Sequence, residues 1–198
     1  MTTGVLILAA GAASRMGRAK MLLPFKSTNI LTHLLNEIKA IEPHCICLLT
    51  GFYHEEMINN IDTNGLYIVQ NEHWEKGMAC SIRMGVYEMT KKYPGLSSII
   101  IIVSDQPYLN KQVLHEMVIV HTKTKKGIIA AEYGSIKGTP VLFDKKYFTE
   151  LMLLEGDIGA KSILQQHAAD IATVAFSSGE IDIDTPEDYD KLSHKTKN

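Results

Sequence analysis

The sequence contains little of what disulfide-rich and zinc-binding proteins need. Its 198 residues include three cysteines, Cys45, Cys47 and Cys80, which form neither a CxxC pair nor an even disulfide set. The eight histidines are scattered without an HExxH motif, so nothing indicates a transition-metal site. These absences favour buried thiols in a reducing compartment. A site for a hard cation, built from carboxylates, remains open.

Charge of one sign and long apolar runs are also missing. The formal net charge is −2, and no run of Lys and Arg exceeds a pair before the tail, whereas a nucleic-acid-binding surface needs clustered cations. The apolar segment 5–10 is far shorter than the roughly 20 residues of a membrane helix, and the first residues carry no basic signal region. We therefore predict a cytoplasmic protein with no nucleic-acid partner and no membrane partner.

Short β-branched runs alternate with amphipathic helical stretches along the chain, which is typical of a layered α/β fold. Residues 98–103 are apolar at successive positions, as a strand covered on both faces should be, and are predicted to form the central strand. Further strands are predicted at residues 5–9, 45–50, 67–70, 128–132, 141–143 after a turn at 138–140, and 172–176. Helices are predicted at residues 54–61, 110–123, 145–153 and 160–167. One more begins at Ile30, with Thr28 or Asn29 as its N-cap, and another begins at Pro186. A further helix is indicated by an apolar stripe of Met78, Ile82, Val86 and Met89.

This pattern predicts one α/β domain over residues 1–192, a three-layer α/β/α Rossmann-like fold with a mostly parallel sheet, followed by a frayed tail at 193–198. Ligands of such folds bind at the carboxyl ends of the strands. The first strand is followed there by a loop of small residues that contains Gly11, Arg15 and Lys20. It is neither a Walker A loop nor a dinucleotide fingerprint. Its cations suit a triphosphate, although an ordinary βα turn with solvent-facing cations is the alternative.

A second informative junction follows the most apolar strand, in Ser104-Asp105-Gln106-Pro107. Pro107 ends the strand. Asp105 lies about five residues before the helix predicted near Asn110, which is too early for a direct cap. We interpret Asp105 as a Mg²⁺ ligand, because this ion is usually held by one or two carboxylates together with substrate phosphates.

Taken in order, motifs over nearly the whole chain resemble the molybdenum cofactor nucleotidyltransferases. They are Arg15-Met16-Gly17 with Lys20, Leu22-Leu23-Pro24, Asn71 with Gly77 and Ser81, residues 104–107, Gly138-Thr139-Pro140, residues 156–160 and residues 182–188. The resemblance implies a Mg²⁺-dependent enzyme that moves a nucleoside monophosphate from an NTP to the phosphate of molybdopterin and releases pyrophosphate. Ala9-Ala10-Gly11, together with the Leu-Leu-Pro segment, resembles the cytidylyl-transferring branch, which implies CTP. Guanylyl transfer remains an alternative.

The resemblance also implies a role for individual residues. Arg15, Lys20 and Asp105 would be catalytic, the first two by holding the triphosphate and Asp105 by binding the metal. The nucleotide would further contact Leu8, Ala9, Ala10, Gly11 and Ser81. The acceptor would contact Gly156, Asp157, Gly159 and Lys161. Asp184 would be a second metal ligand, with Asp182 as its alternative. Purely structural roles stay open for Ser81 as a helix cap, for Asp157 in a turn, and for Asp184 or Thr185 as the N-cap of the last helix.

Two other functions stay open at this point. A sugar- or alditol-phosphate nucleotidyltransferase would share the first loop and Asp105 but would not need residues 156–161. A non-catalytic carrier that delivers the cofactor to a recipient molybdoenzyme would bind the pterin without releasing pyrophosphate. An enzyme of the implied kind needs no general base, because the acceptor phosphate is already ionised at neutral pH. A nucleotidyltransferase of this kind would also contact a recipient molybdoenzyme transiently.

Overall fold

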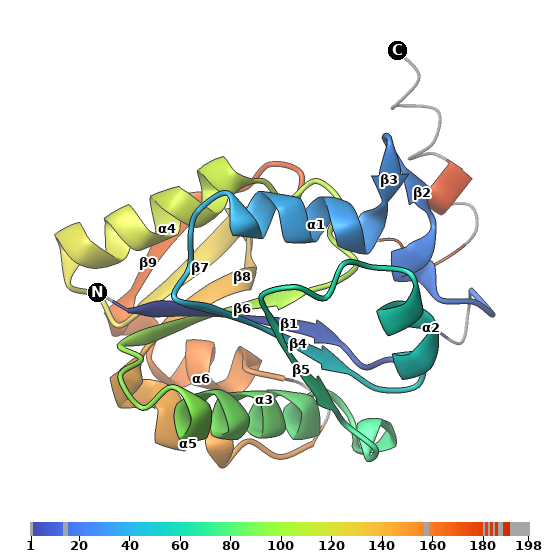
Figure 1. Cartoon of the computed structure of the whole chain (residues 1–198). Coiled ribbons are helices and arrows are strands. Elements are labelled where there is room, and N and C mark those ends of the chain that lie inside the picture. The colour runs from blue at the N-terminus through green and yellow to red at the C-terminus, as the bar shows by residue number, and fades with distance from the viewer. Residues whose placement is uncertain are drawn as a thin grey trace.

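A sheet of seven strands forms the middle of the computed structural model, which describes residues 2–13, 16–156 and 159–179 together with 181, 183, 185 and 188–190 (Figure 1). Its order is β5-β4-β1-β6-β8-β7-β9. The strands are β1 (Thr3–Ala9), β4 (Cys45–Thr50), β5 (Leu66–Gln70), β6 (Ser98–Val103), β7 (Ile128–Tyr133), β8 (Ile136–Asp144) and β9 (Ile171–Ala175). β8 runs antiparallel to β6 and β7, and the other pairs are parallel, so the predicted mostly parallel sheet is confirmed.

Helices cover both faces of this sheet and complete the three predicted layers (Figure 1). α1 (Ile30–Lys39), α2 (His54–Asn59) and α4 (Lys111–Thr124) lie on one face, and α3 (Met78–Lys92), α5 (Phe148–Met152) and α6 (Lys161–Gln166) on the other. Short 3₁₀ turns occur at Lys20–Leu22, Trp74–Lys76, Lys145–Tyr147 and Ala168–Asp170. Among the described residues no helix has both the length and the apolarity that a membrane span needs.

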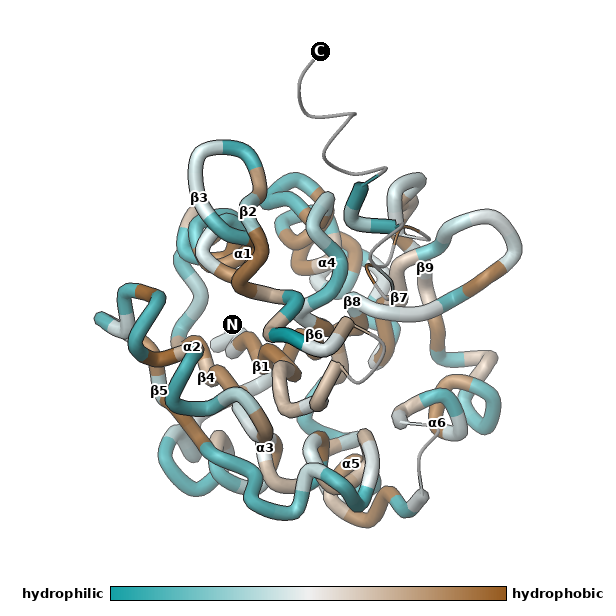
Figure 2. Tube along the Cα trace, turned by 90° about the vertical axis from the view of Figure 1, so that its right-hand side faces the viewer, coloured by the Kyte–Doolittle hydropathy of each residue, from teal (hydrophilic) through white to brown (hydrophobic). Residues whose placement is uncertain are grey.

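Successive residues of β1 pack into different cores. Val5 and Ile7 are buried in the cluster beneath α1 and α4, while Leu6 and Leu8 are buried in the cluster beneath α3 and α5. A strand with apolar residues at every position is stable only where both faces are covered. β6 has the same character and stands fourth in the seven-strand order, which confirms it as the central strand. Hydrophobic residues accordingly gather along the strands, and hydrophilic ones along outer loops (Figure 2).

Asparagine side chains cap two helices on the face above β1. Asn29 Oδ1 accepts a hydrogen bond from the backbone N–H of Thr32 at 2.7 Å, so Asn29 rather than Thr28 is the N-cap of α1. Asn110 Oδ1 accepts from the N–H of Val113 at 3.1 Å at the start of α4. These bonds satisfy N–H groups that a helix start leaves without a partner. Because Asn110 caps α4, Asp105 has no capping role there.

A third, smaller core lies outside the two sheet layers and involves the loop after β1. Its buried members are Met16, Leu23, Phe25, Ile30 and Ile183. The hairpin of β2 (Pro24–Phe25) and β3 (Thr28–Asn29), which was not predicted, contributes to it. Tyr189 packs on this core and donates from its hydroxyl to the carbonyl oxygen of Pro24 at 2.9 Å. The start and the end of the chain are thereby joined beside the carboxyl edge of the sheet.

The predicted turn at Gly138-Thr139-Pro140 is wrong, because all three residues belong to β8. The turn lies earlier, around Gly134, whose φ of +59° suits a residue without a side chain. Proline is compatible with β8 because the register with β7 is irregular here, between Ala130 and Ala131, and proline occurs in sheets at such places.

Three sequence expectations concern the cysteines and the end of the chain. Cys45 and Cys47 are buried in β4, as expected, and burial raises the pKa of their thiols to about 11 and about 12. The helix start predicted at Pro186 lies outside the described residues, as does the tail at 193–198. Thr185, one of its two candidate N-caps, exchanges hydrogen bonds with Asp188, as in a capping box.

The close approach of Gly51 to Ala10 leads to a stability prediction. Gly51 follows β4, and a methyl carbon there would lie 2.3 Å from the carbonyl oxygen of Ala10. Gly51→Ala should therefore reduce the free energy of unfolding by roughly 1–3 kcal/mol, the usual cost of overpacking, as measured by urea denaturation. Gly95→Ala is the matched control, because Gly95 is exposed and has no atom within 4 Å of the added carbon. Equal losses in the two variants would contradict the prediction.

Candidate active site

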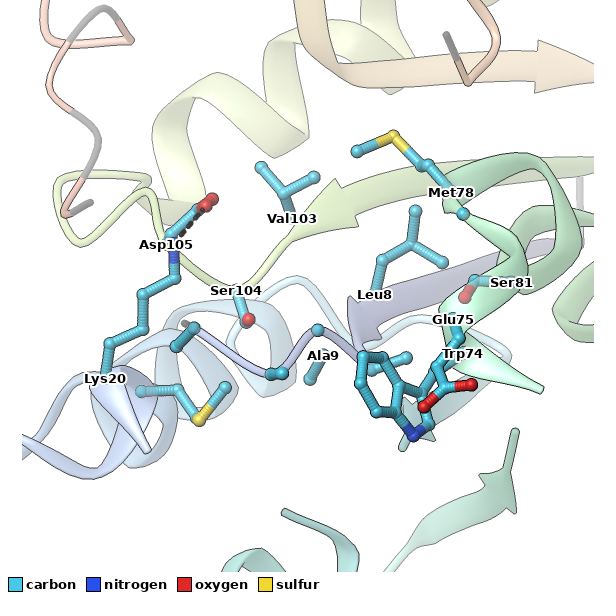
Figure 3. A pocket seen from close by; sticks show the side chains of 16 residues that line it. Leu8, Ala9, Lys20, Trp74, Glu75, Met78, Ser81, Val103, Ser104 and Asp105 are labelled. Atoms are coloured by element: carbon cyan, nitrogen blue, oxygen red, sulfur yellow. Dashed lines mark hydrogen bonds and ion pairs between the residues drawn. The ribbon is translucent and has the colours of Figure 1, made fainter. Parts of the chain in front are cut away.

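A cavity of about 520 Å³ opens at the carboxyl edge of the sheet. Its walls come from segments that are distant in the sequence: the loop after β1, the end of β6 and the start of α3 with the turn before it (Figure 3). The lining residues are Leu8, Ala9, Ala10, Gly11, Ala12, Ala13, Lys20, Met21, Trp74, Glu75, Gly77, Met78, Ser81, Val103, Ser104 and Asp105. This is the position at which open α/β sheets bind their ligands.

The loop after β1 forms the floor of the cavity with small side chains. Ala10 is 6% exposed, and its carbonyl oxygen accepts from the N–H of Phe52 at 3.1 Å, which fixes the loop against the end of β4. Further on, the N–H groups of Met16 and Gly17 both donate to the carbonyl oxygen of Ala13, at 2.8 and 3.1 Å. Of the two predicted phosphate-binding cations, Arg15 lies outside the described residues and Lys20 lines the cavity.

Lys20 and Asp105 meet directly at one end of the cavity (Figure 3). The Nζ of Lys20 lies 2.9 Å from Oδ2 of Asp105, and the two side chains are 14% and 24% exposed. The other carboxylate oxygen, Oδ1, is buried and has no hydrogen-bond partner among the described residues. Buried acceptors of this kind are uncommon, and an ionised one left unpaired is costly. A cation or a hydrogen-bond donor bound at Oδ1 would therefore stabilise the buried carboxylate of Asp105.

The donor set at Asp105 fits a hard cation that takes most of its ligands from substrate and water. Within residues 2–13, 16–156 and 159–179 and the few described positions beyond them, no three His, Cys, Asp or Glu side chains gather into a metal site. Mg²⁺ does not need such a cage, since one or two carboxylates plus phosphates suffice. The predicted second ligand, Asp184, and its alternative Asp182 lie outside the described residues. Ile183 donates its N–H to the carbonyl oxygen of Asp105 at 3.3 Å.

Ser81 lines the cavity from within α3, and its hydroxyl accepts a hydrogen bond from Nδ2 of Asn71 at 3.0 Å. It does not cap the helix: Gly77, with φ of +88°, is the N-cap of α3. The capping alternative for Ser81 is therefore wrong. Asn71 is fully buried, and its Oδ1 accepts from the N–H of His73 at 2.9 Å. This amide therefore joins α3 to the turn that carries Trp74.

Of the predicted acceptor residues, Gly159 lies beside the cavity rather than in its wall. Gly159, with φ of +57°, packs against Met78, such that an added methyl carbon would lie 2.7 Å from the Met78 sulfur. Met78 in turn lines the cavity and is 42% exposed, whereas Ile82, Val86 and Met89 of the same predicted stripe are buried. Gly156, Gly159 and Lys161 are not lining residues, although Lys161 begins α6 nearby in sequence. Asp157 lies outside the described residues.

Trp74 and Glu75 are among the lining residues that were not anticipated (Figure 3). They belong to a 3₁₀ turn that precedes Gly77, and the Trp74 ring lies 5.3 Å from the ring of Phe52 in an edge-to-face arrangement. The one feature of the sequence that could have indicated this part of the wall is a tryptophan in an otherwise polar segment. Since it is the sole tryptophan of the chain, its fluorescence reports on this cavity.

Helices on both faces of a mostly parallel sheet, with a cation and a carboxylate at its carboxyl edge, define a three-layer Rossmann-like fold with a charged ligand site. Comparison with protein families identifies the group within this class. Residues 5–171 match the MobA-like NTP transferase domain, and the chain belongs to that family. The resemblance found in the sequence is thereby confirmed at the level of the family.

Individual relatives agree with this assignment. The chain is 30% identical over 199 residues to the purine catabolism protein PucB of Bacillus subtilis, with 93% of each chain covered. It is 26% identical over 191 residues to the molybdenum cofactor cytidylyltransferase of Escherichia coli, with 93% of this chain and 92% of the relative covered. Among solved structures, Rv0371c of Mycobacterium tuberculosis has a TM-score of 0.82 at 26% identity, covering 96% and 95% of the two chains.

The Asn71 amide is predicted to hold one wall of the site. Asn71→Ala leaves the Ser81 hydroxyl and the His73 N–H without this partner, and should reduce the free energy of unfolding by roughly 1–3 kcal/mol. The emission of Trp74 should shift to longer wavelength as its turn loosens. Asn64→Ala is the control, because Asn64 is exposed and its side chain donates to the neighbouring Asp62, away from the cavity. An unchanged Trp74 spectrum in Asn71→Ala would show that the amide does not position this wall.

Proposed function

We propose that the protein is a Mg²⁺-dependent molybdenum cofactor cytidylyltransferase, which transfers CMP from CTP to the phosphate of molybdopterin and releases pyrophosphate. The observation that carries this proposal is the Lys20–Asp105 contact at 2.9 Å, inside a cavity large enough for a nucleotide. The second carboxylate oxygen of Asp105 is buried there and could bind a metal ion. A relative with this activity in its name, similar over nearly its full length, supports the choice of substrate.

The chemistry needed from the chain is positioning and neutralisation of charge. In phosphoryl-type transfer the acceptor phosphate oxygen attacks the α-phosphorus as pyrophosphate leaves, with little covalent help from the protein. Lys20 would hold phosphate oxygens and offset their charge, and Arg15 would assist it. The small side chains at Ala9, Ala10 and Gly11 allow the backbone to approach the base and ribose closely.

Asp105 would hold the divalent cation through its buried oxygen, with Asp184 as the proposed second ligand. When bound, Mg²⁺ supplies Lewis-acid stabilisation of the charge that develops on the phosphates. A structure of Rv0371c has been solved in complex with manganese, which supports a divalent cation in proteins of this fold. Gly156, Asp157, Gly159 and Lys161 would receive the acceptor, and Ser81 would lie near the nucleotide.

Removing the metal carboxylate tests the proposal. Asp105→Asn should lower the rate of pyrophosphate release, measured with Mg²⁺, CTP and molybdopterin, by well over tenfold, because each tenfold in rate corresponds to only about 1.4 kcal/mol. The thermal unfolding transition should remain cooperative. Asp62→Asn is the control, because Asp62 is exposed and pairs with Lys39 away from the cavity.

Three outcomes of such assays distinguish the competing functions. Turnover by Asp105→Asn within about threefold of the parent would remove Asp105 from the essential machinery. Pterin binding without pyrophosphate release by the parent, with any NTP, would favour the carrier for a recipient molybdoenzyme. Consumption of NTP with a sugar or alditol phosphate, and not with molybdopterin, would favour a sugar- or alditol-phosphate nucleotidyltransferase.

Nucleotide choice is expected to depend on Ala10. Its side chain and carbonyl are packed against Phe52 and Gly51, so it fixes the hydrogen-bonding edge that faces the base. The parent should show a higher kcat/KM for CTP than for GTP, and Ala10→Gly should lower this ratio a few-fold by making room for a purine. Both nucleotides are compared at the same Mg²⁺ and molybdopterin concentrations. Preference of the parent for GTP would replace the cytidylyl assignment with guanylyl transfer.

A further inference from the structure

The carboxylate proposed to hold the metal already has a cation bound to it. Lys20 Nζ contacts one oxygen of Asp105, and both groups are largely shielded from water, at 14% and 24% exposure. The ammonium therefore neutralises Asp105 without any metal. Two cations that use one partly buried carboxylate repel each other more strongly than they would in water. A metal ion that approaches this protein alone meets that repulsion.

We propose that Lys20 acts as an internal counter-ion that makes metal binding conditional on nucleotide. This inference rests on the proposed function. Without nucleotide, Lys20 satisfies Asp105 and keeps divalent cations weakly bound. A triphosphate offers Lys20 a stronger anionic partner, and its phosphate oxygens are themselves ligands for a hard cation. Nucleotide binding thus frees the carboxylate and completes the donor set in one event.

The backbone around the two groups suits this exchange. Lys20 opens a short 3₁₀ turn whose next residue, Met21, is 2% exposed and anchored in the core, so the backbone stays in place while the side chain moves. The lysine ammonium stands on a flexible four-carbon stem and can change partners without moving the chain. Asp105 has a much shorter side chain, and its backbone carbonyl oxygen accepts from the N–H of Ile183. A short carboxylate side chain thus faces a long cationic one that can change partners.

Thermodynamic linkage makes the consequence reciprocal. If nucleotide raises the affinity of the protein for metal by some factor, then metal raises its affinity for nucleotide by the same factor. Part of that factor comes from the Lys20 charge, which opposes metal before nucleotide binds and contacts phosphate afterwards. Removing the charge while keeping the length of the side chain should therefore improve metal binding to the free protein and reduce the coupling.

Mn²⁺ binding to the full chain, followed by electron paramagnetic resonance without nucleotide, tests the first half. Lys20→Met should bind Mn²⁺ at least tenfold more tightly than the parent, and Asp105→Asn should abolish this binding in both backgrounds. Lys76→Met is the matched control, because it removes an exposed lysine beside Trp74 that does not line the cavity. It should leave the Mn²⁺ affinity unchanged.

CTP titrations followed by Trp74 fluorescence, with and without Mn²⁺, test the second half. Mn²⁺ should tighten CTP binding to the parent, and this gain should be at least fivefold smaller in Lys20→Met. Equal or weaker Mn²⁺ binding by folded Lys20→Met would overturn the inference, as would an undiminished gain. Lys20→Gln provides a second neutral variant if Lys20→Met fails to fold. The Mn²⁺ comparison does not require turnover. A parent protein that consumes no NTP would therefore contradict the proposed function, while the inference about Lys20 would still be decided by Mn²⁺ binding.

Discussion

The parallel pairing of β1 with β6 is the constraint on which the site depends. Leu8 lies opposite Val103 in this register, so the two strands reach the carboxyl edge of the sheet together. The loop that contains Lys20 and the segment that contains Asp105 start from that edge, which brings residues far apart in the chain within 2.9 Å of each other. Both strands are apolar along most of their length and covered on both sides, so a shift in their pairing would carry a large loss of burial.

Much of the fold could be predicted from the sequence because local signals agreed with the global arrangement. The apolar run at 98–103, the candidate cap Asn29 and the alternation of strands with helices each depend on neighbouring residues. The turn at Gly138 was misplaced because a glycine and a proline also occur at strand irregularities, and the partner strand that creates the irregularity is not visible locally.

The site was predicted as separate residues rather than as contacts. Lys20 and Asp105 were assigned to triphosphate and metal from their positions after two strands, but their direct contact depends on strand order, which periodicity does not determine. Met78 was placed on one apolar stripe with Ile82, Val86 and Met89 by its spacing, and this spacing does not show that the cavity leaves Met78 exposed. Trp74 had no motif, and its place in the wall follows from the Asn71 amide that holds its turn.

The small core of Met16, Leu23, Phe25, Ile30 and Ile183 has an evolutionary consequence. It supports the cation-bearing loop separately from the two large cores that stabilise the sheet. Substitutions within it alter how the loop presents Lys20 to a ligand, while most of the buried area that keeps the protein folded is untouched. Selection can thus retune substrate preference at low cost in stability, which lets one scaffold diversify among nucleotides and acceptors.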